Sequence, residues 1–399
     1  MNIERNNINK LYVCNVIINL FVLLFCGAVL QTLLIERGVP EEKVNIYISV
    51  MQIVQTLSML LLSEKMDSVK NVIKWHVLPF YAAVPFAVFL VILSLNGDFF
   101  ADKTIFVLYA TGILFNFFYS LHMILTYKLP YHVMDMKIYG RYTAIVGIVS
   151  SIAALIITSL LSFFQKMYGF FEVMSYLYFA SLILTFVLVF LGLSLKRVNK
   201  EIVSEKKENR KINIFKYKPF YSLLIPNFLR GFCSGIIGLA VSIGFSQNLL
   251  DAQSSSYLVI ITNAATITGC LFYGLISMKK IEDKLVFLSS LSIFVFLPVM
   301  FFGKSTMVFL FFYGIMYFFF ILINYGTPVL ITRIVDYDVM GQYTSWRLLV
   351  SAAGTALAGF CCSGMLEFFG AVLTMLITGS MQLVSGVWYY VYVKKVKKI

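Results

Sequence analysis

Long apolar segments alternate with short polar connections along nearly the whole chain. A membrane-spanning helix requires about 20 mostly apolar residues, and twelve segments meet this requirement. The sequence therefore predicts twelve spanning helices, near residues 11–35, 44–63, 75–96, 104–127, 142–164, 173–195, 219–245, 256–277, 284–302, 306–331, 343–366 and 370–393.

One connection is long and polar, with the sequence KRVNKEIVSEKKENRKINIFKYK at residues 196–218. It divides the predicted helices into six before it and six after it. We therefore expect an all-α membrane protein of two pseudo-symmetric six-helix bundles, 1–195 and 219–399, with 196–218 as a basic cytoplasmic linker.

A short loop sequence occurs twice, once in each half. It reads VMDMKIYGRYT at Val133–Thr143 and IVDYDVMGQYT at Ile334–Thr344, which is 201 positions later in a chain of 399 residues. Both copies lie in polar gaps between apolar segments, and internal repeats in membrane proteins are typical of transporters. The repeat therefore indicates a chain built twice. The identical positions pair Asp135, Gly140, Tyr142 and Thr143 with Asp336, Gly341, Tyr343 and Thr344.

The composition and the placement of charge define the environment of the chain. Hydrophobic residues make up 60% and charged residues 13%, against roughly 25% charged in soluble domains. The net charge is +13, and 26 of the 32 lysines and arginines lie in alternate connections, against five in the opposite set. The positive-inside rule then places both termini in the cytoplasm. The basic charge thus reports topology, and we expect no nucleic-acid partner.

The six-plus-six helices, the basic central loop and the half-length repeat together resemble the major facilitator superfamily. The resemblance covers the whole chain and implies two six-helix bundles with one binding site between them, near the membrane midplane. The family signature in the loop after the second helix is G-x-x-x-D-x-x-G-[RK]. Here the loop reads SEKMDSVKN, so Asp67 matches, while Ser63, Lys70 and Asn71 replace the other signature residues.

Two regions of the sequence bear on the subfamily. The run VDYDVMGQYTSWR resembles the D-Y-x-x-x-x-x-G-x-R loop of glycoside–cation symporters, through Asp336 and Tyr337, but the spacing to Gly341 is shorter. The fifth helix lacks the G-x-x-x-G-P-x-x-G-G pattern of drug antiporters. This difference weakens an efflux interpretation without excluding it.

Charged residues are rare inside the predicted spans. All 19 acidic residues lie in loops or near helix ends, although intramembrane carboxylates are the usual proton relays of coupled carriers. Three alternatives stay open: coupling to H⁺ or Na⁺ through another group, operation as a facilitator, or coupling through a boundary carboxylate such as Asp135, Asp336 or Glu36. Arg230 is the one charge deep in a span, about 18 Å of helix beyond Lys218. It either binds an anionic group of a solute or anchors helix ends.

Polar and aromatic side chains follow single faces of several predicted helices. Polar groups that face lipid are costly, so these faces point either to a pocket or to neighbouring helices. In the family fold, helices 1, 4, 7 and 10 line the cavity, which favours some of these residues as pocket residues. The predicted substrate-binding residues are Asn19, Gln52, Gln55, Asn116, Tyr119, His122, Arg230, Tyr317 and Asn324.

A second set of charged residues lies near the predicted cytoplasmic ends of the helices. The family fold brings the two bundles together there, so ion pairs at this level would lock the outward-facing state. Gly140 and Gly341 permit the turn into the next helix. The predicted gating residues are Asp67, Asp135, Arg141, Asp336 and Arg347.

The leading hypothesis is a secondary transporter of a small polar solute in the cell membrane, without cofactor, metal ligands or catalytic residues. The cargo is either anionic or a sugar or nucleoside, and we expect a monomer. No Walker A sequence is present, so ATP is not the energy source. The alternatives are an efflux antiporter and a polytopic membrane enzyme, such as an acyl or glycosyl transferase, in which His132 with Asp135 would be the nearest acid–base combination.

Overall fold

The computed structural model describes residues 2–25, 28–39, 41–95, 102–198, 214–217, 219–250, 254–276, 281–303 and 305–396. All regular secondary structure within these ranges is helical. By its internal contacts the chain divides into two compact units. Unit 1 comprises Met1–Met136 and Ile152–Arg210, and unit 2 comprises Lys137–Ser151 and Lys211–Ile399.

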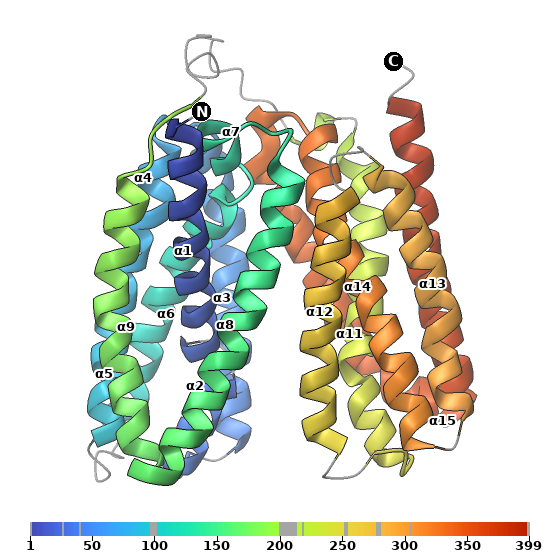
Figure 1. Ribbon diagram of the computed structural model, residues 1–399, viewed down its shortest axis with the longest axis horizontal. Coiled ribbons are helices and arrows are strands. Elements are labelled where there is room, and N and C mark those ends of the chain that lie inside the picture. Colours follow the sequence, from blue (N-terminus) through green and yellow to red (C-terminus); the bar gives the residue numbers. More distant parts are fainter. Residues whose placement is uncertain are drawn as a thin grey trace. The chain divides into compact units, whose positions relative to one another are not determined.

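Unit 1 holds most of the helices from the first half of the chain. The helix α8 (Tyr139–Tyr168) is shared, because its residues up to Ser151 pack with unit 2 and its later residues with unit 1. The other α-helices of unit 1 are α1 (Asn2–Phe25), α2 (Ala28–Glu36), α3 (Glu41–Asp67), α4 (Val72–Val77), α5 (Ala83–Leu95), α6 (Asp102–Leu125), α7 (Leu129–Val133) and α9 (Phe170–Leu193), shown in Figure 1.

The third predicted span is interrupted by a tighter helical turn. A 3-10 helix, η1 (Leu78–Ala82), connects α4 to α5. Pro79 stands in the first turn of η1, and proline has no N–H with which to continue an α-helical hydrogen-bond ladder. The interruption is therefore a direct consequence of the sequence.

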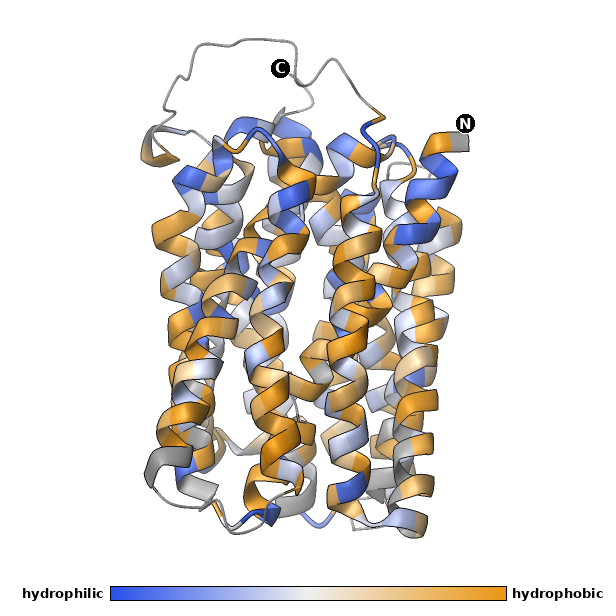
Figure 2. Ribbon diagram, turned by 90° about the vertical axis from the view of Figure 1, so that its left-hand side faces the viewer, coloured by the Kyte–Doolittle hydropathy of each residue, from blue (hydrophilic) through white to orange (hydrophobic). Residues whose placement is uncertain are grey.

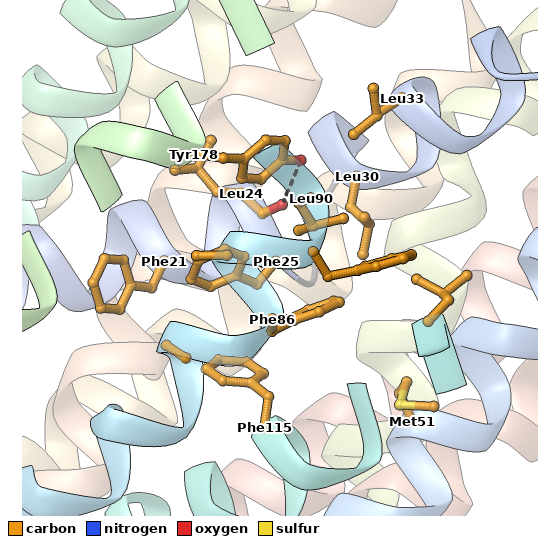
Figure 3. Close-up of a cluster of buried hydrophobic side chains, with 14 of the residues drawn as sticks. Phe21, Leu24, Phe25, Leu30, Leu33, Met51, Phe86, Leu90, Phe115 and Tyr178 are labelled. Atoms are coloured by element: carbon orange, nitrogen blue, oxygen red, sulfur yellow. Dashed lines mark hydrogen bonds between the residues drawn. The ribbon is translucent and has the colours of Figure 1, made fainter. Parts of the chain in front are cut away.

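Aromatic rings form the centre of the core of unit 1 (Figure 3). The ring of Phe25 on α1 lies 5.5 Å from that of Phe86 on α5 and 5.3 Å from that of Phe115 on α6. Tyr178 on α9 stacks on Phe25 at 6.1 Å, and its hydroxyl donates a hydrogen bond of 3.2 Å to the Leu24 carbonyl. Each such ring pair contributes about 0.5–1.5 kcal/mol beyond burial. These contacts bind α1, α5, α6 and α9 into one body.

Unit 2 contains the helices of the second half. One of them, α15, contains a break at Gly370, where φ is 71° and ψ is 171°. Glycine adopts positive φ without steric cost, so the two last predicted helices meet at this residue. The elements are η2 (Ile214–Lys216), α11 (Pro219–Ser246), α12 (Ser254–Ile276), α13 (Glu282–Phe302), α14 (Thr306–Ile334), η4 (Tyr337–Val339) and α15 (Met340–Val396).

Glycines bring α11 and α15 into close backbone contact inside unit 2. A Cβ atom at Gly231 would overlap the carbonyl oxygen of Ser351, and a Cβ at Gly354 would lie 2.8 Å from the Phe232 amide nitrogen. The Thr355 hydroxyl donates a hydrogen bond of 3.0 Å to the Gly231 carbonyl. Small residues allow membrane helices to approach in this way. The side chains that flank Gly231 are consequently held close to α15.

The repeated loop has the same helix boundaries in both halves. The helix before it ends at Val133 in the first copy and at Ile334 in the second, and the next helix starts at Tyr139 and at Met340. Each pair of positions is separated by the same 201 residues as the sequence repeat. The repeat therefore describes local structure as well as sequence.

The helices have the length and composition of membrane spans. Within the described part of the chain, ten are long and apolar enough to cross a membrane. Figure 2 shows apolar residues along the helices, with hydrophilic residues concentrated near their ends. The predicted span 11–35 corresponds to α1 and α2, and 256–277 corresponds to α12, whose apolar part is Ile260–Ile276. The total of twelve spans stays a prediction, as does the boundary between bundles at 196–218.

Candidate functional site

An aromatic cluster in unit 1 contains two of the predicted binding residues, Tyr119 and His122. Their rings stack at 5.5 Å, and the ring of His122 lies 4.2 Å from that of His76 on α4. The His122 Nδ1 atom lies 3.2 Å from the His76 carbonyl oxygen. Because a carbonyl oxygen only accepts, Nδ1 of His122 must carry the proton. Both histidines are buried, at 5% and 6% exposure, so α4 and α6 hold a fixed, enclosed pair of imidazoles.

The other predicted residues of unit 1 have varied surroundings. Asn116 is buried, and its amide donates a hydrogen bond of 2.9 Å to the Gly112 carbonyl of its own helix. That bond uses only one of its two N–H groups. Asn19 on α1 and Gln52 on α3 are exposed, and Gln55 is half-buried. The structure therefore groups Tyr119 and His122 closely.

The predicted residues of unit 2 include a direct contact between α11 and α14. The Arg230 guanidinium donates a hydrogen bond through Nη2 to the Asn324 side-chain oxygen. Tyr317, two turns before Asn324 on α14, stacks on Tyr313 with ring centroids 5.9 Å apart. Arg230, Tyr317 and Asn324 are all half-buried. This arrangement presents one guanidinium, one amide and one phenol on adjoining helices.

Three further residues of unit 2 extend this polar group, although sequence reasoning did not select them as site residues. The Asn227 amide, one turn before Arg230 on α11, lies 3.1 Å from the Tyr343 hydroxyl. Tyr343 and Tyr389 are buried at 0% and 1% exposure, and Asn227 at 2%. Asn227 is a polar residue within an apolar predicted span, and Tyr343 is in the repeated loop, so both carried a sequence signal. Tyr389 carried none beyond being polar within an apolar run.

Asp67, the residue that matches the family signature, forms a buried ion pair in unit 1. The Lys128 ammonium lies 2.6 Å from Asp67 Oδ1 and donates a second bond of 3.0 Å to the Asp67 carbonyl. The side chains are 1% and 5% exposed for Lys128 and Asp67. The pair fastens the end of α3 to the segment between α6 and α7.

A comparable ion pair occurs in unit 2. Arg333, near the end of α14, donates through both terminal nitrogens to Glu282 at the start of α13, with Nη2 lying 2.8 Å from Oε1. The Glu282 side chain is 1% exposed. Each unit therefore contains one such pair. In unit 1, Asp67 at the end of α3 pairs with Lys128, which follows α6. In unit 2, Glu282 at the start of α13 pairs with Arg333 near the end of α14. The sequence spacing did not predict either pair.

The repeated aspartates make matching backbone contacts. The Asp135 N–H donates a bond of 2.7 Å to the Glu4 carboxylate, and the Asp336 N–H donates one of 2.9 Å to the Tyr217 hydroxyl. Glu4 and Tyr217 each belong to the segment where the first helix of that half begins. Burial raises the pKa of Tyr217 to about 12, so this hydroxyl stays neutral at physiological pH. The carboxylates of Asp135 and Asp336 are exposed, as is Arg141.

His132, which would be the base of an enzyme, occupies a buried and electropositive position. Its residue is 3% exposed, and its carbonyl accepts a bond of 2.8 Å from the Val198 N–H. Burial first, and then the charges of Arg197 and Lys128, lower the pKa of His132 to about 4. A catalytic dyad with a carboxylate requires the opposite effect, because an adjacent anion raises the pKa of histidine.

No protein-family model and no curated protein matches the sequence. Among solved structures, a bacterial homologue of the iron transporter ferroportin, in the outward-facing state, matches with a TM-score of 0.70 and 14% identity, over 99% of this chain and 100% of that one. The proton:xylose symporter XylE matches with a TM-score of 0.68 and 10% identity, over 98% and 96%. The human organic anion transporter MFSD10 matches with a TM-score of 0.63 and 11% identity, over 97% and 99%.

These matches extend over the whole length of each protein and show a major facilitator superfamily fold. The resemblance drawn from topology and repeat is therefore confirmed. At identities of 14% and below, the likeness concerns the fold alone. The cargo of this chain must be argued from its own residues.

Proposed function

We propose that this protein is a secondary transporter that moves a small polar solute across the membrane by alternating access at one central site. The observation that carries the proposal is the full-length match to the major facilitator fold. Proteins with this fold and no nucleotide-binding domain move solutes by exposing a site to each side in turn. Their cargoes differ, as the iron, xylose and organic-anion proteins show.

The proposed solute contacts fall into one group from each unit. Tyr119 and His122 provide a ring surface and an imidazole in unit 1, and Arg230 with Asn324 provides a guanidinium and an amide in unit 2. Rings and hydrogen-bonding groups together suit a polar solute with an apolar face. Asn19, Gln52, Gln55, Asn116 and Tyr317 complete the proposed set.

In the proposed topology, the protein crosses the cell membrane twelve times, and both termini lie in the cytoplasm. The excess of lysines and arginines in one set of connections supports this orientation, because positive charge is retained on the cytoplasmic side. The protein would act as a monomer, and either H⁺ or Na⁺ is the proposed coupling ion.

The exposed carboxylates of Asp135 and Asp336, with Arg141, are the proposed cytoplasmic gate. Their backbones are anchored by matching hydrogen bonds, and their carboxylates lie at the surface. Asp336→Asn should therefore shift the resting population toward the inward-facing state. Spin labels at Ser68 and Lys284, both exposed, should move apart in the variant. An unchanged distance distribution would remove Asp336 from the gate.

An efflux antiporter of the same fold is the second candidate, and a polytopic enzyme is the third. The environment of His132 weighs against the enzyme, because its nearby charges are cationic. Thermal stabilisation of the purified protein by a panel of metabolites tests the proposal, since a ligand raises the melting temperature of the state that binds it. A stabilising solute that the protein converts chemically would establish the enzyme instead.

A further inference from the structure

Two of the three histidines of the chain lie inside membrane spans, and they form one pair in unit 1. His76 belongs to the span Val72–Leu95 and His122 to the span Ile105–Leu125. Their ring centroids are 4.2 Å apart, and both side chains are buried. His76 is four residues after the start of α4, and His122 is three residues before the end of α6. Both helix ends adjoin connections predicted to be cytoplasmic, so the pair lies about one turn inside that boundary.

The break in the helix at Pro79 leaves the His76 carbonyl available to this pair. In the i to i+3 pattern of a 3-10 helix, that carbonyl would accept from residue 79, and proline has no N–H. The carbonyl lies 3.2 Å from Nδ1 of His122, which therefore carries the proton. A neutral imidazole has only one protonated nitrogen. The lone pair of His122 that can accept a further proton is consequently on Nε2.

The other imidazole has an unmet polar atom. Nδ1 of His76 is buried, and among the described residues no group forms a hydrogen bond with it. Buried polar atoms are paired in the large majority of cases, and an exception requires water, an ion or a functional role to explain it. A contact with a purely structural role would not require this atom to be left unpaired inside a span.

The acidic side chains of unit 1 offer no alternative proton site within its spans. In the described helices of this unit, each aspartate and glutamate stands in the first or last turn, and Asp135 stands in a connection. Histidine is the side chain that ordinarily changes charge near neutrality. The pair of His76 and His122 is therefore the group in these spans that is suited to bind and release a proton at physiological pH.

The surroundings of the pair provide aromatic rings and no counter-ion. The ring of Phe80 lies edge-on, 4.8 Å from that of His122, and Tyr119 stacks on His122 at 5.5 Å. In the part of the chain that the structure describes, no carboxylate contacts either imidazole.

Other titratable groups come from the elements that pack against α4 and α6, which are α3, α5, α7 and α9. Asp67 of α3 is engaged by Lys128 at 2.6 Å. On α4 itself Lys74 is exposed, and α7 carries Tyr131 and His132. α5 has no titratable side chain, and α9 has none between Tyr178 and its end. A charge on the pair is therefore not neutralised by these neighbours.

The pair can hold one proton at most. Two imidazolium charges with ring centroids 4.2 Å apart would repel strongly in a medium of low dielectric. A single charge is also unfavourable while the rings are enclosed, because burial without a counter-ion disfavours the charged form. Protonation therefore favours a state in which water reaches the pair, and the nearest predicted aqueous side is the cytoplasm.

We propose that the pair of His76 and His122 is the proton-binding site of the transporter and that H⁺, rather than Na⁺, is its coupling ion. A proton from water adds to Nε2 of His122 in the state that is open to the cytoplasm, which gives one imidazolium with a net charge of +1. The same N–H bond breaks, and the proton returns to water, when the pair is enclosed in its neutral form. This inference rests on the proposed transport function. Because His122 is also a proposed solute contact, proton and solute act on one side chain, and their binding is linked.

The test follows the protonation of histidine and the conformation of the protein over the same pH range. Purified protein with isotope-labelled histidine is titrated by NMR from about pH 8 to about pH 5, where histidine ordinarily changes charge. His122 should gain a proton while His76 stays neutral. In separate samples, spin labels at Ser68 and Lys284, both exposed, should move apart over the same interval. The ratio of open to closed populations should change by up to about tenfold per pH unit, as the binding of one proton requires.

His122→Asn separates the proton site from the packing, because asparagine keeps an N–H near the position of Nδ1 and has no basic nitrogen. Its label distances should not depend on pH. His132→Gln is the matched control, since His132 lies on α7, outside the spans, and this variant should respond as wild type does. A neutral His122 throughout the titration, or an equal response in His122→Asn, overturns the inference. Protonation and opening in a protein that moves no solute into proteoliposomes would instead remove the proposed transport function and leave the proton site.

Discussion

Removal of the Lys128 charge should destabilise unit 1 more than any exposed substitution. The Lys128 ammonium and the Asp67 carboxylate are 2.6 Å apart and almost fully buried. At an effective dielectric of about 20, their attraction is roughly 6 kcal/mol before the cost of desolvation. Lys128→Met leaves the Asp67 carboxylate buried without this cation, and breaking a buried pair in this way costs about 3–5 kcal/mol. For a unit of this size, the melting temperature should fall on the order of 10 °C.

The assay is thermal unfolding in detergent, with a double-mutant cycle. Asp67→Asn should destabilise comparably, while the double variant should lose less than the sum, because no charge is left buried. Lys65→Met, at an exposed position on the same helix, is the control and should change stability by less than about 0.5 kcal/mol. Additive effects of the two single substitutions would refute the reasoning, since they would show that the two groups do not interact.

Three further predictions concern other parts of the chain. Gly231→Ala should lower the free energy of unfolding by about 1–3 kcal/mol, because the added methyl overpacks α11 against α15. Gly238→Ala, with open space around the residue, should be neutral or stabilising. Equal melting temperatures of the two variants would contradict this prediction. His132 has a pKa lowered from 6.5 to about 4, so its contribution to stability is complete above pH 6.5 and is lost as the pH falls toward 4. The melting temperature of His132→Gln should therefore depend less on pH between 4 and 6.5 than that of wild type. An unchanged pH dependence would exclude His132 as its source. In intact cells an impermeant thiol reagent should label Gln247→Cys and spare Ser68→Cys, and the reverse pattern would invert the proposed topology.

The sequence predicted most of the helices because the apolar pattern acts locally. The span predicted at 173–195 is α9 (Phe170–Leu193), and that at 306–331 lies within α14. The break at Pro79 was not predicted, although proline provided the signal. The two spans predicted at 343–366 and 370–393 are both present, and the glycine that separates them, Gly370, has a positive φ.

The repeated loop was the most informative sequence feature, because its structure is determined within a few residues. Its helix boundaries follow the repeat, and its aspartates receive matching backbone contacts. The partners Glu4 and Tyr217 are distant in sequence and could not be inferred from it. The same limit applies to the ion pair of Lys128 with Asp67, 61 residues apart.

The sequence indicated candidate site residues by their type, but it did not indicate which residues they contact. Arg230 was selected because a charge deep in a span is costly, and Asn324 because it continues a polar stripe. Their contact depends on how α11 and α14 pack, which periodicity does not report.

Solute flux into proteoliposomes tests the central claim most directly. Vesicles that contain the purified protein would receive, as labelled tracer, the solute that stabilises it best in the binding assay. The account predicts saturable entry of unchanged solute, absent from empty vesicles and strongly reduced by Arg230→Gln. Saturable binding without entry, or entry only of a chemically altered product, would contradict the assignment of this protein as a transporter.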